Sequence, residues 1–188
     1  AKQRAEIINQ KGLALAHDPT HENFAALADG ADDKTKKYLA GVLLEARTMS
    51  DPLAVEQELK DKVYDPYLTA DGLMAAQRKA ASAATTVRNV AAKDISVALN
   101  DEIAATKETG EIVENAALSD ANIDAVFPAA DAEKIKKERD DSLEFAKTVF
   151  DVNTSSPEMI KVKLDELQKA VSDRGDDVAD ISKRDTYI

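Results

Sequence analysis

The chain has 188 residues, a net charge of −11 and no cysteine, and its isoelectric point is about 4.7. This length suits one large domain or two small ones with a buried core. The negative charge disfavours direct binding to nucleic-acid phosphates and to anionic membranes. The absence of cysteine excludes disulfides, thiolate metal sites and cysteine nucleophiles, and no apolar run approaches the roughly 20 residues that cross a bilayer.

The composition favours helices over strands. Apolar residues make up 44% of the chain, but aromatic residues only 4%. Strands usually contain more β-branched and aromatic side chains, whereas small and linear apolar residues suit closely packed helices. We therefore predict an all-α fold, an elongated multi-helix bundle with one long helix and several shorter capped ones.

The first third of the chain predicts three short segments of helix. Residues 2–16 form a helix with a rough apolar stripe, which ends in the turn at Pro19 because proline cannot continue a helix. A short helix over 21–28 follows and ends at Gly30. Asp32 or Asp33 then caps a third helix, whose apolar face contains Tyr38, Leu39, Val42, Leu43 and Ala46.

The next helix begins with a strong start signal. Asp51 supplies the cap, and Pro52 stands at the first helical position, where its missing N–H costs nothing. The apolar pattern continues to Tyr64. Asp65 and Pro66 then stop the helix, because the residue before a proline disfavours the helical conformation.

Residues 69–108 contain no proline and predict one long helix of about 60 Å, at 1.5 Å per residue. Apolar residues recur every three or four positions, which is the helical period. Most are small, so a neighbouring helix could approach the backbone closely. A break near Asn89 or Asp94 is the alternative. The stripe contains Leu73, Ala76, Ala80, Ala84, Val87, Ala91, Ile95, Ala98 and either Leu99 or Glu102.

Gly110 marks the end of the long helix, and Ser119 caps a short helix that closes at Phe127 and Pro128. Residues 129–150 predict a helix with Ile135, Leu143, Ala146, Val149 and Phe150 inward. Ser156 and Pro157 open another, through about residue 171. A turn at 173–175 and a last helix over 176–187 follow. We expect two helical halves, residues 1–110 and 111–188, with one continuous domain as the alternative.

Two groups of residues could suggest a metal site. His17 and His21 are the only histidines, but Pro19 between them breaks the helical geometry that would let them share an ion. The aspartates resemble a calcium loop only loosely, because they lack its regular spacing and its terminal glutamate. Helix-start charges account for them better. These aspartates are Asp29, Asp32 and Asp33 in one cluster and Asp173, Asp176, Asp177 and Asp180 in the other.

Two short motifs are expected by chance in such a chain. Arg174, Gly175 and Asp176 spell a cell-adhesion tripeptide, and residues 153–155 match the glycosylation acceptor pattern, which indicates a polar loop. The chain has no phosphate loop, dinucleotide fingerprint, or serine in a glycine-flanked turn with a histidine partner. We therefore predict no catalytic, cofactor-binding or metal-binding residues, no cofactor and no enzymatic activity for this segment.

Residues 118–167 resemble helical spacer regions of large bacteriophage internal virion proteins, the core or DNA-ejection proteins that can also carry a transglycosylase. The resemblance lies in a capped short helix that ends in an aromatic residue, a charged helix with a late apolar face, and a Ser-Pro-Glu start to a leucine-containing helix. No catalytic segment accompanies it, so no functional residue is carried over. The matching residues are Leu118, Ser119, Ile123, Phe127, Phe145, Val149, Phe150, Ser156, Pro157, Glu158, Leu164 and Leu167.

This resemblance implies a structural module that acts in virion assembly and genome delivery. It would lie inside the particle or be ejected into the host envelope, and its partners would be other virion proteins or copies of itself in a homo-oligomer, without direct nucleic-acid binding. The chain begins with Ala1 and ends at Ile188 without a stop signal, so we expect a segment of a larger protein. A helical sensor or ligand-binding domain of a bacterial receptor is the alternative, and a helical enzyme without a familiar signature is a third possibility.

Overall fold

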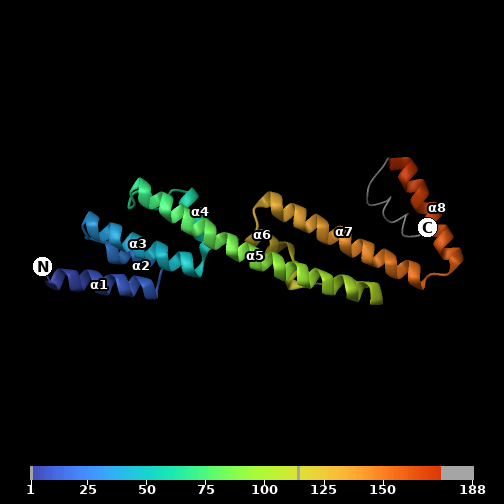
Figure 1. The fold of residues 1–188 in the computed structure, drawn as a ribbon, viewed down its shortest axis with the longest axis horizontal. Helices are drawn as coiled ribbons and strands as arrows, with labels where there is room; N and C mark the ends of the chain where they lie inside the picture. Colours follow the sequence, from blue (N-terminus) through green and yellow to red (C-terminus); the bar gives the residue numbers. More distant parts are fainter. Residues whose placement is uncertain (1, 114, 175–188) are drawn as a thin grey trace. The chain divides into compact units, whose positions relative to one another are not determined.

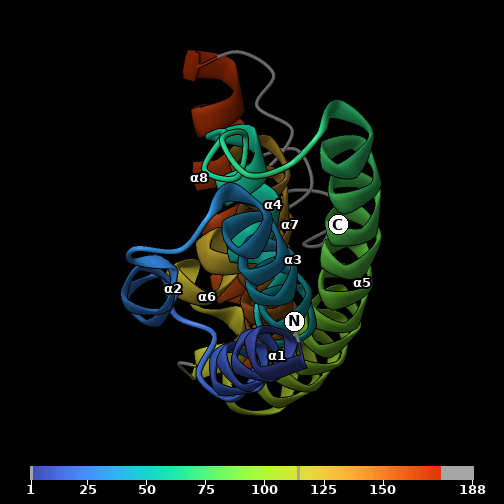
Figure 2. The same cartoon turned by 90° about the vertical axis from the view of Figure 1, so that its left-hand side faces the viewer.

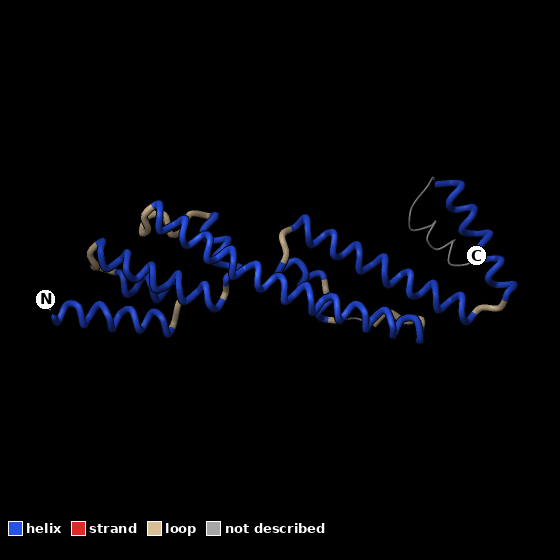
Figure 3. Tube along the Cα trace, viewed as in Figure 1, coloured by secondary structure: helices blue, strands red, loops and turns tan. Residues whose placement is uncertain are grey.

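The computed structural model describes residues 2–113 and 115–174, and all regular structure within these ranges is helical (Figure 3). The all-α prediction is therefore confirmed. The elements, labelled in Figure 1, are α1 Lys2–His17, α2 His21–Ala28, α3 Asp33–Ser50, α4 Pro52–Lys60, α5 Ala70–Thr109, the 3₁₀ turn η1 Ala116–Leu118, α6 Asp120–Val126, α7 Ala129–Thr154 and α8 Pro157–Arg174.

Local capping chemistry sets the starts of these helices. A side-chain oxygen accepts a hydrogen bond from a backbone N–H of the first turn, which satisfies a group that has no partner within the helix. Asp32 is the residue that caps α3, through Thr35 N at 2.8 Å. Asp51 caps α4 ahead of Pro52, and Ser119 caps α6, as predicted.

The predicted end of the fourth helix was wrong, because α4 stops at Lys60 and not at Tyr64. Lys62 adopts a left-handed conformation with φ of 62°. Its N–H donates to Leu59 O, and the N–H of Val63 donates to Glu58 O. These two bonds form the Schellman motif that terminates many helices. The turn carries Tyr64 back towards α4.

α5 is one unbroken 40-residue helix, so the long helix is confirmed and the alternative break near Asn89 or Asp94 does not occur (Figure 1). The structure nevertheless forms two compact units, Ala1–Asn89 and Val90–Ile188. The first half of α5 belongs to one unit and the second half to the other. The change of unit thus falls inside the helix, earlier in the chain than the domain boundary predicted at residue 110.

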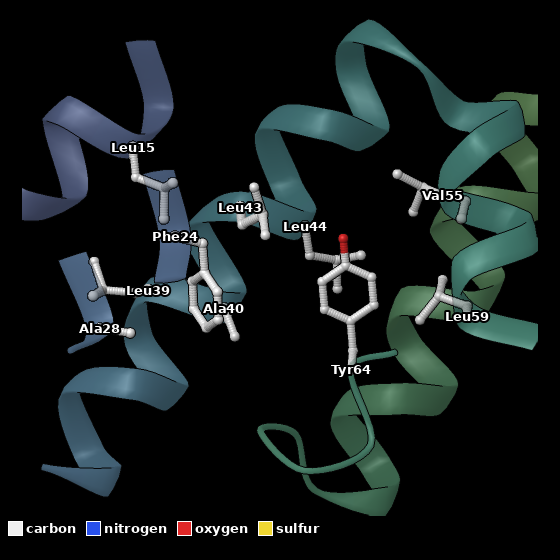
Figure 4. Packing of buried hydrophobic residues seen from close by; sticks show 11 residues of the cluster. Leu15, Phe24, Ala28, Leu39, Ala40, Leu43, Leu44, Val55, Leu59 and Tyr64 are labelled. Atoms are coloured by element: carbon white, nitrogen blue, oxygen red, sulfur yellow. The ribbon is translucent and has the colours of Figure 1, made fainter. Parts of the chain in front are cut away.

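In the first unit, α3 contacts α1, α2 and α4 (Figure 2). Its buried side chains meet Leu15 of α1, Phe24 of α2 and Val55 of α4, and Ala80 of α5 completes this core. Figure 4 shows the Tyr64 ring between Leu44 of α3 and the α4 side chains Val55 and Leu59, and this tyrosine is only 2% exposed. Phe24 also meets Tyr67 edge to face, with ring centroids 5.2 Å apart.

The second unit has a smaller core, formed by Ile95 of α5, Leu118 of η1, Ile123 of α6 and Ala132 of α7. α6 packs against η1 and α7. The helix predicted over 129–150 continues to Thr154, the last residue of α7. Of its predicted inward residues, Leu143 and Ala146 are buried, whereas Ile135, Val149 and Phe150 are partly buried.

α8 runs to Arg174, so Asp173 and Arg174 are helical and their predicted turn was wrong. Gly175 and the helix predicted over 176–187 lie outside the described residues. Within the described ranges, no helix combines the length and the apolar character that a membrane crossing requires.

Candidate functional site

The described residues that could have suggested a metal site lie at or near helix ends. His17 ends α1, and His21 begins α2. Asp29 and Asp32 flank helix ends, and Asp32 also pairs with Arg4. Among the described residues, no three histidine, aspartate or glutamate side chains come together as metal ligands. Asp176, Asp177 and Asp180 lie outside those residues.

The glycosylation-like motif does not lie in a loop, contrary to the sequence interpretation. Asn153 and Thr154 occupy the last turn of α7, and only Ser155 follows the helix as its C-cap. Thr154 donates its hydroxyl to Phe150 O at 2.8 Å. Of the adhesion-like tripeptide, Arg174 is the last residue of α8, while Gly175 and Asp176 are outside the described part of the chain.

A polar cluster forms around Glu58 in the first unit. The Glu58 carboxylate accepts hydrogen bonds from Arg47 of α3 and from the Tyr64 hydroxyl, the latter at 2.8 Å. His21 Nε2 of α2 lies 3.1 Å from Glu58 Oε1. The cluster therefore connects three helices and the turn after α4.

The electrostatics of this cluster favour an ionised Glu58. Burial would raise the pKa of this carboxyl, but hydrogen bonds from Tyr64 and His21 and the charge of Arg47 outweigh it, so the pKa lies below its ordinary 4.5. Burial and the hydrogen bond to Glu58 raise the pKa of Tyr64. Tyr64 therefore stays a donor and Glu58 an acceptor at neutral pH, which suits a structural role.

The second unit contains an open groove of about 910 Å³, with residues 112–113 and 115–119 on one side and α7 on the other. Its apolar residues include Ile112 and Val113, which are 51% and 60% exposed. Leu118 and Leu143 line it as well. A cleft of this size can accept several side chains of a ligand or partner.

An arginine fixes the walls of this groove. The Arg139 guanidinium on α7 binds Asp120 and Asp140 and also donates to the backbone carbonyl of Leu118. The hydrogen bond from Arg139 lowers the pKa of Asp120. One side chain thus links η1, α6 and α7 at the groove.

A buried glutamate holds the other side of the groove in place. Glu102 of α5 is only 7% exposed and accepts a hydrogen bond from Val113 N at 2.6 Å. Thr106, which is fully buried, donates to Glu111 O at 3.3 Å. These bonds tie the segment after Gly110 to the helix that precedes it.

Sequence reasoning did not single out these two features. Arg47, Glu58 and Tyr64 stand on different elements, so no local spacing links them. The sequence carries one sign of the groove: Ile112 and Val113 are apolar residues in the short connection between a helix-ending glycine and a helix cap. Comparison of the chain with protein-family models, with curated proteins and with solved structures gave no match.

Proposed function

We propose that this chain is a non-catalytic helical module of a large phage virion protein, and that it acts in particle assembly and genome delivery. The observation that supports this proposal best is α5, a 40-residue helix that belongs to two compact units. At 1.5 Å per residue the helix extends about 60 Å. One element thus offers both length and two packing surfaces, as a spacer requires.

The exposed apolar residues also support a role in protein contacts. Val90 and Val97 stand seven positions apart on α5 and are 57% and 53% exposed. In the second unit, Ile112, Val113 and Met159 are each more than half exposed. Such exposed apolar side chains are available for contact with a partner protein.

Mass spectrometry of purified particles tests this proposal. Peptides of the chain should be present in intact virions at several copies per particle, and they should leave the particle when the genome is ejected. Their absence from particles would refute the proposal. Recovery from host membranes as part of a receptor would instead support the sensor-domain alternative.

A further inference from the structure

We propose that the second half of α5 pairs with the same part of α5 in a second copy, side by side and in parallel. This inference rests on the proposed function, because it specifies how copies of the module would contact one another. The contact would use an apolar stripe, here called the α5 stripe, which consists of Val90, Val97 and Ala104.

The α5 stripe belongs to a pattern that repeats every seven residues. Three consecutive repeats begin with a stripe residue, and each has a lysine or asparagine at its fourth position and a carboxylate at its fifth. These repeats begin at residues 90, 97 and 104. A seven-residue period keeps equivalent side chains on nearly the same face of a helix, and it is typical of helices that pair along their length.

The whole pattern is exposed. Val90 and Val97 are 57% and 53% exposed, and Ala104 is exposed as well. Residues three and four positions after a stripe residue lie on its two sides. Exposed side chains therefore form a basic or amide flank and an acidic flank, namely Lys93, Asn100 and Lys107 on one side and Asp94, Asp101 and Glu108 on the other.

Packing within the second unit does not account for this surface. The buried residues of the same stretch, Ile95, Glu102 and Thr106, lie on the opposite face of α5. The unit therefore uses one face of this stretch for its own core and leaves the α5 stripe uncovered among the described residues.

The charges on the two flanks are unpaired within the part of the chain that the structure describes. No flanking charge has an opposite charge three or four positions away on α5, where ion pairs along a helix form. α7 differs, because Lys134 pairs with Glu138 and Lys136 pairs with Glu133. The flanks of the α5 stripe are therefore free to pair with another chain.

The signs of the two flanks select both the partner and its direction. In a parallel pair of identical helices, each flank meets the opposite flank of the other copy, so lysines face carboxylates. In an antiparallel pair, each flank meets its own counterpart, and like charges repel. A uniformly basic helix start, such as that of α3 with Lys34, Lys36 and Lys37, would match the acidic flank but repel the lysines of the other.

A parallel pair in register satisfies all three repeats at once. Each stripe residue meets the same residue of the other copy, and valine at such positions favours two-stranded pairs. The flanking contacts join Lys93 to Asp94, Asn100 to Asp101 and Lys107 to Glu108 of the other copy. The contact extends over about 27 Å at 1.5 Å per residue. Because its apolar area is small, we expect weak pairing whose direction is decided by charge.

Disulfide cross-linking of the full chain tests this arrangement, because the chain has no cysteine of its own. Val90→Cys, Val97→Cys and Ala104→Cys chains are each equilibrated in a glutathione buffer, and disulfide-linked dimers are measured. Parallel pairing brings equal residues within the roughly 7 Å between Cα atoms that a disulfide spans. Each chain should therefore cross-link to itself at least about tenfold more than the Ala92→Cys control. Ala92 is also exposed on α5 but lies away from the stripe.

Charge exchange tests the two flanks. Lys93→Glu with Lys107→Glu makes both flanks acidic, whereas Asp94→Lys, Asp101→Lys and Glu108→Lys together make both basic. All five residues are exposed, so both variants should fold, which circular dichroism checks. With Val97→Cys present, each variant should lose the cross-linking above the control level. A mixture of the two should regain it as a dimer of unlike chains.

Three results would overturn this inference. Equal cross-linking of the Val97→Cys and Ala92→Cys chains would show that the stripe forms no contact. Stronger linking of Val90→Cys to Ala104→Cys chains than of either to itself would show antiparallel pairing. A charge-exchanged mixture that does not regain cross-linking would show that the flanks do not meet. None of these results bears on whether peptides of the chain occur in virions, so the proposed function fails or stands separately.

Discussion

Glu58→Gln should destabilise the first unit, because it removes the charge on which three donors converge. Arg47, Tyr64 and His21 all point at this carboxylate. The Arg47 and Glu58 side chains are each only 19% exposed. Water therefore solvates the Arg47 guanidinium poorly once the Glu58 charge is removed, and the guanidinium remains mostly buried beside a neutral amide.

The magnitude lies between two limits. An exposed ion pair contributes at most about 1 kcal/mol, whereas breaking a fully buried pair costs about 3–5 kcal/mol. This pair is mostly buried, and Arg47 Nε already lacks a hydrogen-bond partner among the described residues. We therefore expect Glu58→Gln to lower the free energy of unfolding by about 2 kcal/mol, since a hydrogen bond to a charged group contributes about 1.5–3 kcal/mol.

Urea unfolding followed by tyrosine fluorescence measures this loss. Tyr38, Tyr64 and Tyr67 belong to the first unit, and the chain has no tryptophan. Glu45→Gln is the control, because Glu45 forms an ion pair with Lys79 in which both side chains are more than half exposed. That control should change stability by less than about 0.5 kcal/mol.

The pH dependence gives a second test of the same reasoning. The pKa of Glu58 is lowered on folding, so the unfolded chain binds the proton more readily. The stabilisation is therefore complete above the ordinary value of 4.5 and is lost as the pH falls through the folded-state value. The difference between wild type and Glu58→Gln should shrink in that acidic range. Equal effects of Glu58→Gln and Glu45→Gln at neutral pH would refute the argument.

Other substitutions test packing and local geometry. In thermal unfolding, Gly110→Ala should cost at least about 2 kcal/mol, because φ is positive and the new methyl would meet the Phe150 ring. Gly30→Ala, with a similar φ but open space around it, should cost about 1 kcal/mol in the same measurement. Ala84→Leu at a fully buried position of α5 should cost about 1–3 kcal/mol in urea unfolding, and no loss would show that the packing around Ala84 leaves space for a larger side chain. Ser119→Ala should cost about 1 kcal/mol through the lost α6 cap, and Thr at this position should retain it.

The sequence by itself determined where most helices begin. Asp51 with Pro52, Ser119, and Ser156 with Pro157 all act on backbone groups within one turn, so their effect is readable from adjacent letters. The length of α5 was readable for the same reason, since no proline interrupts it and its apolar period is regular. Gly110 ends α5 with a positive φ that glycine adopts without strain.

Only the tertiary structure decided where α4 ends. The apolar pattern continues to Tyr64, and Lys62 is an unusual residue for a left-handed conformation. The turn there allows the Tyr64 ring to enter the core and its hydroxyl to reach Glu58. Burial of one large side chain outweighs the local preference of a lysine, and adjacent residues carry no sign of this balance.

The Glu58 cluster and the groove could not be predicted from the sequence for a related reason. His21, Arg47 and Glu58 come from three helices, and Glu102 reaches the 111–113 segment only after the chain reverses direction at Gly110. Such contacts depend on how helices pack, which composition and periodicity do not specify. The sequence thus determined most helix starts and the length of α5, while packing decided which charges meet and where the groove lies.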